Sequence, residues 1–251
     1  MRLKVLGSVS PYVKNTRRGV GYLIDAGDGK ILLDCGFGAS GNMSFPEDVR
    51  ALSIIISHYH KDHYADLFAV LYAGLCYNRL GESVKIDVYI PNTSDERTDC
   101  DRRLIENCGI PGVGVHLYDE TTELELHGCR VSFFKTCHDV DNFSVCICRD
   151  GAKLVYSGDM GYKNIDAYCQ FCDAADLLVC EATYLKSDGV KSEYHLYAEE
   201  AAEIARAAGA KRLLLTHIWP EHDRSLYTAE AVRIFPNVST AKENDEYFIG
   251  E

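Results

Sequence analysis

Apolar residues recur along this chain with two different periods, which separate strands from helices. Short alternating or continuous apolar runs predict β-strands. In chain order these runs are Leu3–Leu6, Val20–Asp25, Lys30–Leu33, Ser53–Ser57, Lys85–Ile90, Val113–Leu117, Arg130–Phe134, Ser144–Arg149, Lys153–Tyr156, Asp176–Cys180 and Arg212–Leu215. Apolar residues spaced three and four positions apart predict helices. These helices cover Asp66–Arg79, Asp95–Cys108, Tyr197–Ala208 and Tyr227–Phe235.

Two turn dipeptides and the order of the elements indicate the fold class. Asp28-Gly29 and Asp150-Gly151 each separate two strand-like runs, which is typical of a β-hairpin. Strand-rich and helix-bearing stretches occur in both halves of the chain. Two β-sheets packed face to face, with helices on the outside, satisfy this pattern. No linker or repeat divides the sequence, so we expect one domain over residues 1–251.

Composition and charge narrow the class of function. The chain has 251 residues, with 26 Lys and Arg against 38 Asp and Glu, so its net charge is −12. This balance argues against a long nucleic acid as partner, because binding to a phosphate backbone needs a concentrated basic face. The N-terminus lacks the apolar core of a secretory signal, and no apolar run is long enough to span a bilayer. We therefore expect a cytoplasmic protein without a membrane partner.

Eleven cysteines are present, and a reducing compartment favours free thiols over disulfides. Cys146 and Cys148 alternate on a strand-like stretch, and Cys169 and Cys172 have the spacing of half a zinc knuckle or of a redox pair. A single Cys-x-x-Cys without a second pair is a weak signal, and buried free cysteine is common. Ordinary packing is the preferred interpretation of both pairs.

The strongest chemical signal is the segment His58-Tyr59-His60-Lys61-Asp62-His63, which directly follows a buried strand. A strand end is rigid, and the loop after it can turn three imidazoles and one carboxylate toward one point. These ligand types suit borderline divalent ions, Zn²⁺ first, with Mn²⁺ or Fe as alternatives. The segment therefore predicts a metal centre.

This segment and four later motifs resemble the metallo-β-lactamase superfamily. The other motifs are Leu33-Asp34-Cys35-Gly36, Thr136-Cys137-His138-Asp139, Tyr156-Ser157-Gly158-Asp159 and Leu215-Thr216-His217, in the same order as in the family. The resemblance implies a four-layer αββα sandwich of two mixed β-sheets, within the α/β (α+β) class, with two metal ions at one edge of the sheets. It also implies a homodimer, which composition does not indicate.

The resemblance assigns the metal ligands position by position. It places His58, His60 and His138 on one metal ion, and Asp62, His63 and His217 on the second, with Asp159 bridging the two. Asp34 is expected to orient a ligand or a loop, although capping of a turn before a glycine explains it nearly as well.

Two further residues point to a subfamily. Glu181 in Glu181-Ala-Thr-Tyr184 and His195 before the alanine-rich helix resemble the ribonuclease Z and small phosphodiesterase branch, and most closely its short bacterial metallo-hydrolases of the YhfI type. There the histidine protonates the leaving oxygen and the glutamate holds the histidine, so we expect His195, Glu181 and Asp62 to be catalytic. A helix-entry histidine beside an edge-strand glutamate is the alternative.

Hydrolysis of a small anionic phosphodiester, such as a cyclic nucleotide or a short oligonucleotide, is the function these features favour. Processing of precursor tRNA is disfavoured, because the 20 residues between His138 and Asp159 form a hairpin and no Lys-rich arm is present. Hydrolysis of a lactone, thioester or β-lactam is the main alternative, since the metal ligands suit attack on a carbonyl equally well. Iron-based redox chemistry is disfavoured, because the relatives that perform it carry a flavin domain and we expect none here. The complete ligand set argues against a non-enzymatic protein.

Overall fold

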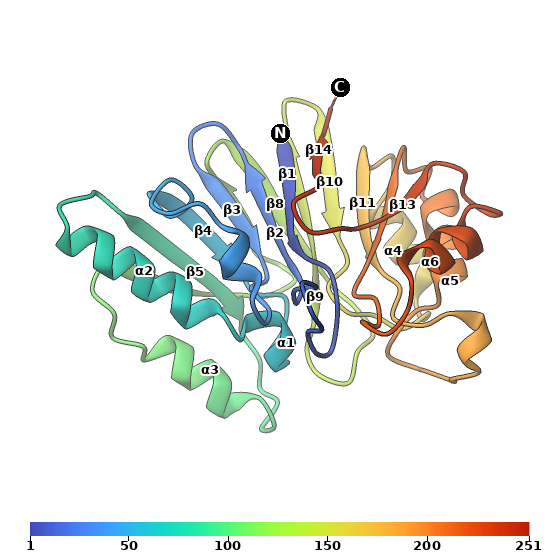
Figure 1. Cartoon of the computed structure of the whole chain (residues 1–251), viewed down its shortest axis with the longest axis horizontal. Helices are drawn as coiled ribbons and strands as arrows, with labels where there is room; N and C mark the ends of the chain where they lie inside the picture. Colours follow the sequence, from blue (N-terminus) through green and yellow to red (C-terminus); the bar gives the residue numbers. More distant parts are fainter. Residues whose placement is uncertain (251) are drawn as a thin grey trace.

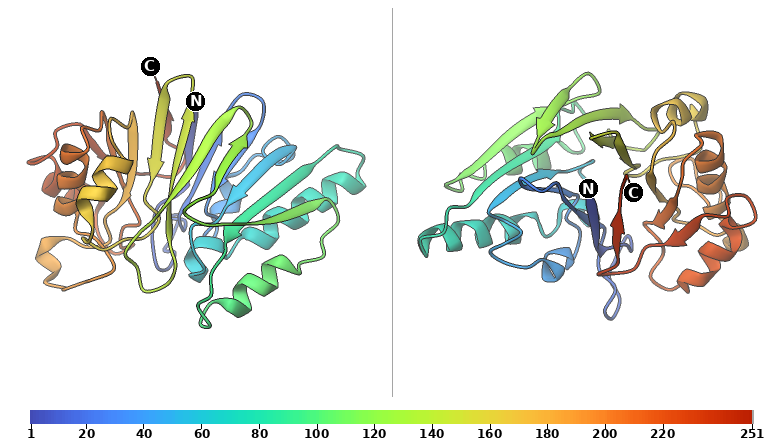
Figure 2. Two further views of the ribbon diagram at one scale, coloured as in Figure 1. Left: turned by 180° about the vertical axis from the view of Figure 1, so that it is seen from behind. Right: turned by 90° about the horizontal axis from the view of Figure 1, so that it is seen from above.

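Two β-sheets pack face to face, and helices lie outside each of them (Figure 1). This computed structural model describes residues 1–250. The view from above shows the helices of the first half of the chain on one side and those of the second half on the other (Figure 2). The predicted four-layer αββα sandwich is confirmed.

The first sheet contains the N-terminal strands and one strand from the C-terminus. Its members are β1 (Arg2–Gly7), β2 (Gly21–Asp25), β3 (Lys30–Leu33), β4 (Ala51–Ile55), β5 (Lys85–Pro91), β6 (Val113–Tyr118) and β14 (Glu246–Phe248). They lie in the order β14-β1-β2-β3-β4-β5-β6. The pairs from β14 to β3 are antiparallel and those from β3 to β6 are parallel, so the sheet is mixed.

The second sheet has a matching division. Its members are β7 (Glu123–Leu126), β8 (Cys129–Lys135), β9 (Phe143–Arg149), β10 (Ala152–Tyr156), β11 (Leu177–Glu181), β12 (Leu213–Thr216) and β13 (Val238–Thr240). They lie in the order β13-β12-β11-β10-β9-β8-β7, with antiparallel pairs from β7 to β10 and parallel pairs from β10 to β13. Strands β8, β10, β11 and β12 therefore all run in one direction and end at one edge.

Helices flank the sheets on their outer faces. These are α1 (Lys61–Tyr64), α2 (Leu67–Arg79) and α3 (Asp99–Glu106) beside the first sheet, and α4 (Ile165–Phe171), α5 (Ala198–Ala207) and α6 (Arg224–Ala231) beside the second. Two short 3₁₀ turns, η1 (Ala39–Asn42) and η2 (Lys186–Asp188), complete the set. No helix in residues 1–250 is long and apolar enough to cross a membrane.

Burial follows the alternation of each strand. Tyr22, Phe133 and Val145 belong to the core between the sheets, where alternate residues of both inner faces meet. Residues of the opposite parity pack under the helices, and Ala201 and Ala205 of α5 let that helix approach its sheet closely. Three apolar clusters thus hold four layers together.

The predicted hairpins form as expected. Asp150 and Gly151 both have positive φ, 51° and 81°, between the paired residues Arg149 and Ala152. Two successive positive φ angles are those of a type I′ turn, whose twist matches that of the strands. Strands β2 and β3 also form an antiparallel pair around Asp28-Gly29.

Two predicted helices have wrong bounds. Helix α6 begins at Arg224 rather than Tyr227, because the Asp223 side chain caps it by accepting a hydrogen bond from the Ser225 backbone N–H. It ends at Ala231 rather than at Phe235. Helix α3 starts later than the predicted Asp95, because the carboxylate of Asp95 accepts the backbone N–H of Arg97 in a local turn that competes with the helix.

Five α-helices and strands were missed, and each is short: α1, expected as part of a loop, has four residues. Strands β13 and β14 have three residues, β7 has four, and α4 has seven. Segments of this length carry too little periodicity to be recognised, and they form because a neighbouring strand or sheet face is already in place. The predicted strand Ser53–Ser57 also ends earlier, at Ile55, so that Ser57 belongs to the loop that follows.

Candidate metal centre

The residues expected to bind metal come from five different segments that meet at one edge of the sandwich. His58 and His60 follow β4, Asp62 and His63 lie on α1, His138 follows β8, Asp159 follows β10 and His217 follows β12. Carboxyl ends of strands that run in one direction share one edge of a sheet, so these side chains converge. In Figure 1 this edge, marked by α1, lies away from the two chain termini.

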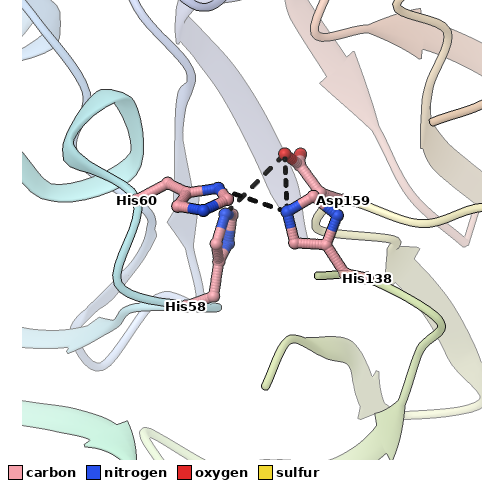
Figure 3. Close-up of side chains that lie close together, drawn as sticks. All are labelled: His58, His60, His138 and Asp159. Atoms are coloured by element: carbon pink, nitrogen blue, oxygen red, sulfur yellow. Dashed lines mark hydrogen bonds and ion pairs between the residues drawn. The ribbon is translucent and has the colours of Figure 1, made fainter. Parts of the chain in front are cut away.

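The first group consists of His58, His60, His138 and Asp159, whose side chains point toward one another (Figure 3). Nδ1 of His60 lies 3.2 Å from Nε2 of His138. Nε2 of His58 and Nε2 of His138 each lie 3.7 Å from Oδ2 of Asp159. Ligand atoms at about 2.0–2.1 Å from one tetrahedral ion are about 3.3–3.4 Å apart. The spacing of this group fits one cation.

The second group consists of Asp62, His63 and His217, and it adjoins the other oxygen of Asp159. Oδ1 of Asp159 lies 3.3 Å from Nε2 of His63 and 3.2 Å from Nε2 of His217. Oδ2 of Asp62 lies 3.7 Å from the same nitrogen of His217. The two oxygens of Asp159 thus face different groups, which is the position of a bridging carboxylate.

Several donor atoms of this cluster are buried without a hydrogen-bond partner. They are Nε2 of His58, His63 and His217, together with Oδ1 of Asp159. Burial of an unpaired polar atom is costly, and buried polar groups elsewhere in proteins are nearly always paired. Four such atoms aimed at one volume fit divalent cations as their partners. The donor set of imidazoles and carboxylates agrees with this fit.

Each of four histidines has its Nδ1 engaged by a neighbour. Nδ1 of His63 lies 2.7 Å from Oδ2 of Asp34, and Nδ1 of His217 lies 2.8 Å from Oγ1 of Thr183. In addition, Nδ1 of His138 donates to the carbonyl of Tyr194 at 3.1 Å, and Nδ1 of His58 contacts Oγ of Ser57 at 3.0 Å. A proton held on Nδ1 leaves the lone pair of Nε2 free for a metal.

The histidine pKa values shift in opposite directions in the two groups, because burial dominates in the first group and the charge of Asp159 dominates at His217. Burial lowers the pKa of His58 well below its usual range and lowers those of His60 and His138, so these rings are neutral ligands at neutral pH. For His217, burial alone would lower the pKa, but Asp159 outweighs it and raises the value to about 10. The same contacts hold the pKa of Asp159 well below its usual range.

Glu181 and His195 lie directly beside the cluster. Oε1 of Glu181 is 2.9 Å from Nδ1 of His195, and that nitrogen is 3.9 Å from Oδ2 of Asp159. The rings of His195 and His217 stack with their centroids 5.3 Å apart. Glu181 is fully buried, whereas 23% of the His195 side chain is exposed. The pair therefore joins the buried sheet edge to the open side of the centre.

The stretch of chain that carries this centre matches a known protein family. The model of the beta-lactamase superfamily domain matches residues 29–218, which include all the residues of both groups. The chain belongs to the metallo-β-lactamase superfamily.

Similar proteins include bacterial, archaeal and human members of this superfamily. The probable metallo-hydrolase YhfI of Bacillus subtilis is 27% identical over 220 residues, 87% of each chain. Its crystal structure superposes with a TM-score of 0.86 at 25% identity and covers 98% of this chain and 99% of that one. Ribonuclease Z of Pyrococcus furiosus is 25% identical over 273 residues, 88% of this chain and 87% of its own. Human tRNase Z, short form, shares the fold, with a TM-score of 0.77 at 23% identity over the whole of both chains.

Membership of the superfamily and likeness to these metallo-hydrolases make this chain a metal-dependent hydrolase.

Every residue that the sequence predicted for the centre lies in or directly beside it, including Glu181 and His195. The Asp34 carboxylate lies against Nδ1 of His63 and accepts the backbone N–H of Ser57, so it contacts a candidate ligand and the loop after β4.

Sequence reasoning missed three residues that hold the candidate ligands. Thr183 contacts His217, and Ser57 contacts His58, but hydroxyl residues beside a motif are too common to stand out. Ser10 donates a hydrogen bond to Oδ2 of Asp62 from the loop after β1. No sequence signal connects Ser10 to Asp62, because the two segments meet only when the sheet edge is assembled.

Proposed function

We propose that this superfamily member is a dinuclear phosphodiesterase that hydrolyses a small anionic phosphodiester, such as a cyclic nucleotide or a short oligonucleotide. The observation that carries the proposal is the Glu181–His195 pair, 2.9 Å apart, at the open side of the metal centre. Metal ligands alone serve many hydrolyses. A partly exposed imidazole that is held by a buried carboxylate can, in addition, donate a proton to a poor leaving group.

The two side-chain groups define where the cations would bind. His58, His60 and His138 would hold one, and Asp62, His63 and His217 the other, with Asp159 between them. Zn²⁺ matches this mixture of imidazole and carboxylate, and Mn²⁺ or Fe can replace it. When bound, two divalent cations lower the pKa of a water and offset the negative charge of a phosphate.

His195 has the charge and the position of a general acid. Burial alone would lower its pKa, but the Glu181 carboxylate outweighs it and raises the pKa above the usual value, so the ring holds its proton near neutral pH. Nδ1 is occupied by Glu181, so Nε2 remains to donate a proton to the leaving oxygen. An alkoxide leaves slowly unless it is protonated as the bond breaks.

Glu181 is held rigidly for this task. Its carboxylate accepts hydrogen bonds from the backbone N–H groups of Met160 and Thr183 and from the hydroxyl of Thr183, all buried. These donors fix the direction of the carboxylate, and so they fix the direction of the His195 ring. The positioning is therefore built into the end of β11.

Two further arguments favour a small phosphodiester. Several relatives, among them that of Pyrococcus furiosus, are ribonucleases by name, and ribonucleases cleave phosphodiester bonds. The net charge of −12 disfavours a long polyanion, while two cations at this centre would attract a single phosphate group.

The test compares two substrates that differ in leaving group. Bis(p-nitrophenyl) phosphate releases a stabilised phenolate, whereas a 2′,3′-cyclic nucleotide releases an alkoxide. We expect about two metal ions per chain, and we expect His195→Ala to lower kcat for the cyclic nucleotide about 10²–10⁴-fold, with a much smaller loss for the activated ester. Metal content should stay unchanged. His116→Ala is the matched control, because His116 also lies 2.9 Å from a carboxylate, that of Asp87, away from the centre.

Three results would contradict the proposal. Equal losses on both substrates would exclude His195 as the acid. Two ions with hydrolysis of lactones or thioesters only would exclude the phosphodiester assignment. One ion per chain in the fully active enzyme would exclude the dinuclear site.

A further inference from the structure

Two cysteines lie side by side on the outer face of β9, far from the metal centre. Sγ of Cys146 is 3.7 Å from Sγ of Cys148. Cys146 is buried beneath the helices of the second sheet, and Cys148, two residues nearer the end of the strand, is half-buried. The sulfur of Cys148 is therefore within reach of solvent and in contact with the Cys146 thiol.

The strands on both sides of β9 place cations beside Cys148. In the register of the sheet, Arg130 of β8 and Lys153 of β10 stand directly opposite Cys148. Residues directly opposite on antiparallel strands project to the same face and contact each other. The two basic side chains therefore flank the sulfur from either side.

A surface cleft of about 470 Å³ opens at this position. Arg130, Cys148 and Lys153 line it, together with the acidic residues Glu125 and Asp150. Glu125 stands opposite Arg130 on β7, and Asp150 lies in the β9–β10 turn. The cleft can hold a group the size of a short peptide next to the sulfur.

We propose that Cys148 is a redox-modification site that forms a mixed disulfide with a small anionic disulfide, for which glutathione disulfide is the probe. The Cys148 thiolate attacks one sulfur of the probe, a new S–S bond forms, and the original S–S bond breaks. The other half of the probe leaves as a thiolate. The Cys148 sulfur is oxidised and the departing sulfur is reduced, so electrons balance without another reactant.

The neighbours of Cys148 favour its thiolate. A hydrogen bond from the Cys146 thiol, followed by the contacts of Arg130 and Lys153, lowers the pKa of Cys148 despite partial burial. The same pairing and burial raise the pKa of Cys146, which therefore stays protonated as the donor. The thiolate is the nucleophile in disulfide exchange.

Strand geometry keeps Cys146 from resolving the mixed disulfide. Residues two apart in a strand have Cα atoms about 6.6–6.8 Å apart, at the upper limit for a disulfide, and their side chains project in parallel. Strand β9 is hydrogen-bonded on both sides, to β8 and to β10, so its backbone cannot bend to close an internal bond. The mixed disulfide is therefore the end product.

The site is separate from the metal centre. The centre adjoins the Phe143 end of β9, where Asn142 donates to the carbonyl of Asp159, whereas Cys148 lies five residues further along. At about 3.3 Å per residue this is about 16 Å. Cys148→Ser should leave hydrolysis by the metal-loaded enzyme unchanged.

The experiment measures which cysteine reacts with glutathione disulfide, and how fast, by intact mass and peptide mapping of the folded protein at pH 7. We expect one glutathione per chain, on Cys148, before any adduct at the exposed Cys76 or Cys100. Each unit by which the pKa falls toward ambient pH raises the thiolate fraction about tenfold and lowers nucleophilicity about threefold. The reaction of Cys148 should therefore be at least about threefold faster than that of either exposed thiol.

Two variants isolate the role of Cys146. Cys146→Ser keeps a hydrogen-bond donor and should keep the rate, whereas Cys146→Ala removes the donor and should slow the reaction about threefold or more. Earlier modification of Cys76 or Cys100 would overturn the proposal. So would equal rates in both Cys146 variants, or a Cys146–Cys148 disulfide in place of the adduct.

Discussion

Oγ1 of Thr183 lies 2.8 Å from Nδ1 of His217 and 2.8 Å from Oε2 of Glu181. The hydroxyl has one proton, so it donates to the carboxylate and accepts from the imidazole. This places the proton of His217 on Nδ1 and aims Nε2 at Asp159. One side chain thus connects the proposed metal ligand to the carboxylate that holds the proposed acid.

Replacement of Thr183 by valine should weaken metal binding. Valine keeps the shape but leaves Nδ1 of His217 without its acceptor, and loss of such a partner costs about 10–100-fold in metal affinity. Competition with a chromogenic chelator measures the affinity. Thr183→Ser should restore it, and Thr216→Val is the control, since the Thr216 hydroxyl contacts Tyr22 instead. Equal losses in Thr183→Val and Thr216→Val would refute the orienting role.

Replacement of Asp34 by asparagine should weaken both the metal centre and the fold. Oδ2 of Asp34 accepts from Nδ1 of His63 at 2.7 Å and from the hydroxyl of Tyr156 at 2.6 Å, and both contacts are buried. An amide cannot accept at both carboxylate positions, so a buried donor loses its partner at a cost of about 1–3 kcal/mol. Urea unfolding and metal titration report the two effects.

Asp48→Asn provides a matched control for Asp34→Asn. Asp48 is also buried, and it accepts from the backbone N–H of Ser44 at 2.6 Å. It contacts none of the proposed ligands in the described residues, so its replacement should destabilise the fold with no change in metal affinity. A parallel loss of metal affinity in both variants would show that Asp34 acts only through stability.

Removal of metal should abolish hydrolysis and lower thermal stability. Bound cations would satisfy the unpaired buried nitrogens and the unpaired oxygen of the centre, and a ligand held at about a hundred times its Kd adds about 2.7 kcal/mol. For a chain of this size that corresponds to roughly 5–10 °C in Tm. Calorimetry before and after dialysis against a chelator tests this. Failure of Zn²⁺ or Mn²⁺ to restore both activity and Tm would count against the centre.

Asp176 gives a stability effect that depends on pH. Burial alone would raise its pKa, but the Lys211 ammonium, 2.6 Å away, and the backbone N–H of Lys153 outweigh burial and lower it. Because the folded-state pKa is below the unfolded value of 3.8, the stabilisation is present above pH 3.8 and is lost as pH falls through the folded-state pKa.

Asp176→Asn should therefore cost about 1 kcal/mol at pH 6 and progressively less below pH 4. Urea unfolding at a series of pH values measures this difference. Asp150→Asn is the control, because Asp150 is almost fully exposed and asparagine suits its positive φ. A difference between Asp176→Asn and the unmodified protein that stays constant from pH 6 to pH 3 would show that ionisation of Asp176 contributes nothing.

Some features of the fold could be predicted because their cause is local. The Asp150-Gly151 hairpin follows from two residues that tolerate positive φ. The alanine-rich helix over Tyr197–Ala208 forms as α5, Ala198–Ala207, because helical periodicity lies within one segment. Strands β13 and β14 were missed since each has three residues and forms a sheet edge only because β12 or β1 is already in place beside it.

For the site, the sequence by itself determined the chemistry: imidazole and carboxylate donors that follow apolar strands, such as His58 after β4 and Asp159 after β10. A rigid strand end and a donor type are properties of a short stretch of chain. Only the tertiary structure decided which side chains aim these donors, as in Thr183 to His217, Asp34 to His63 and Ser10 to Asp62. The physical reason is that a hydrogen bond depends on tenths of an ångström between segments far apart in the chain, and packing of the two sheets sets that distance.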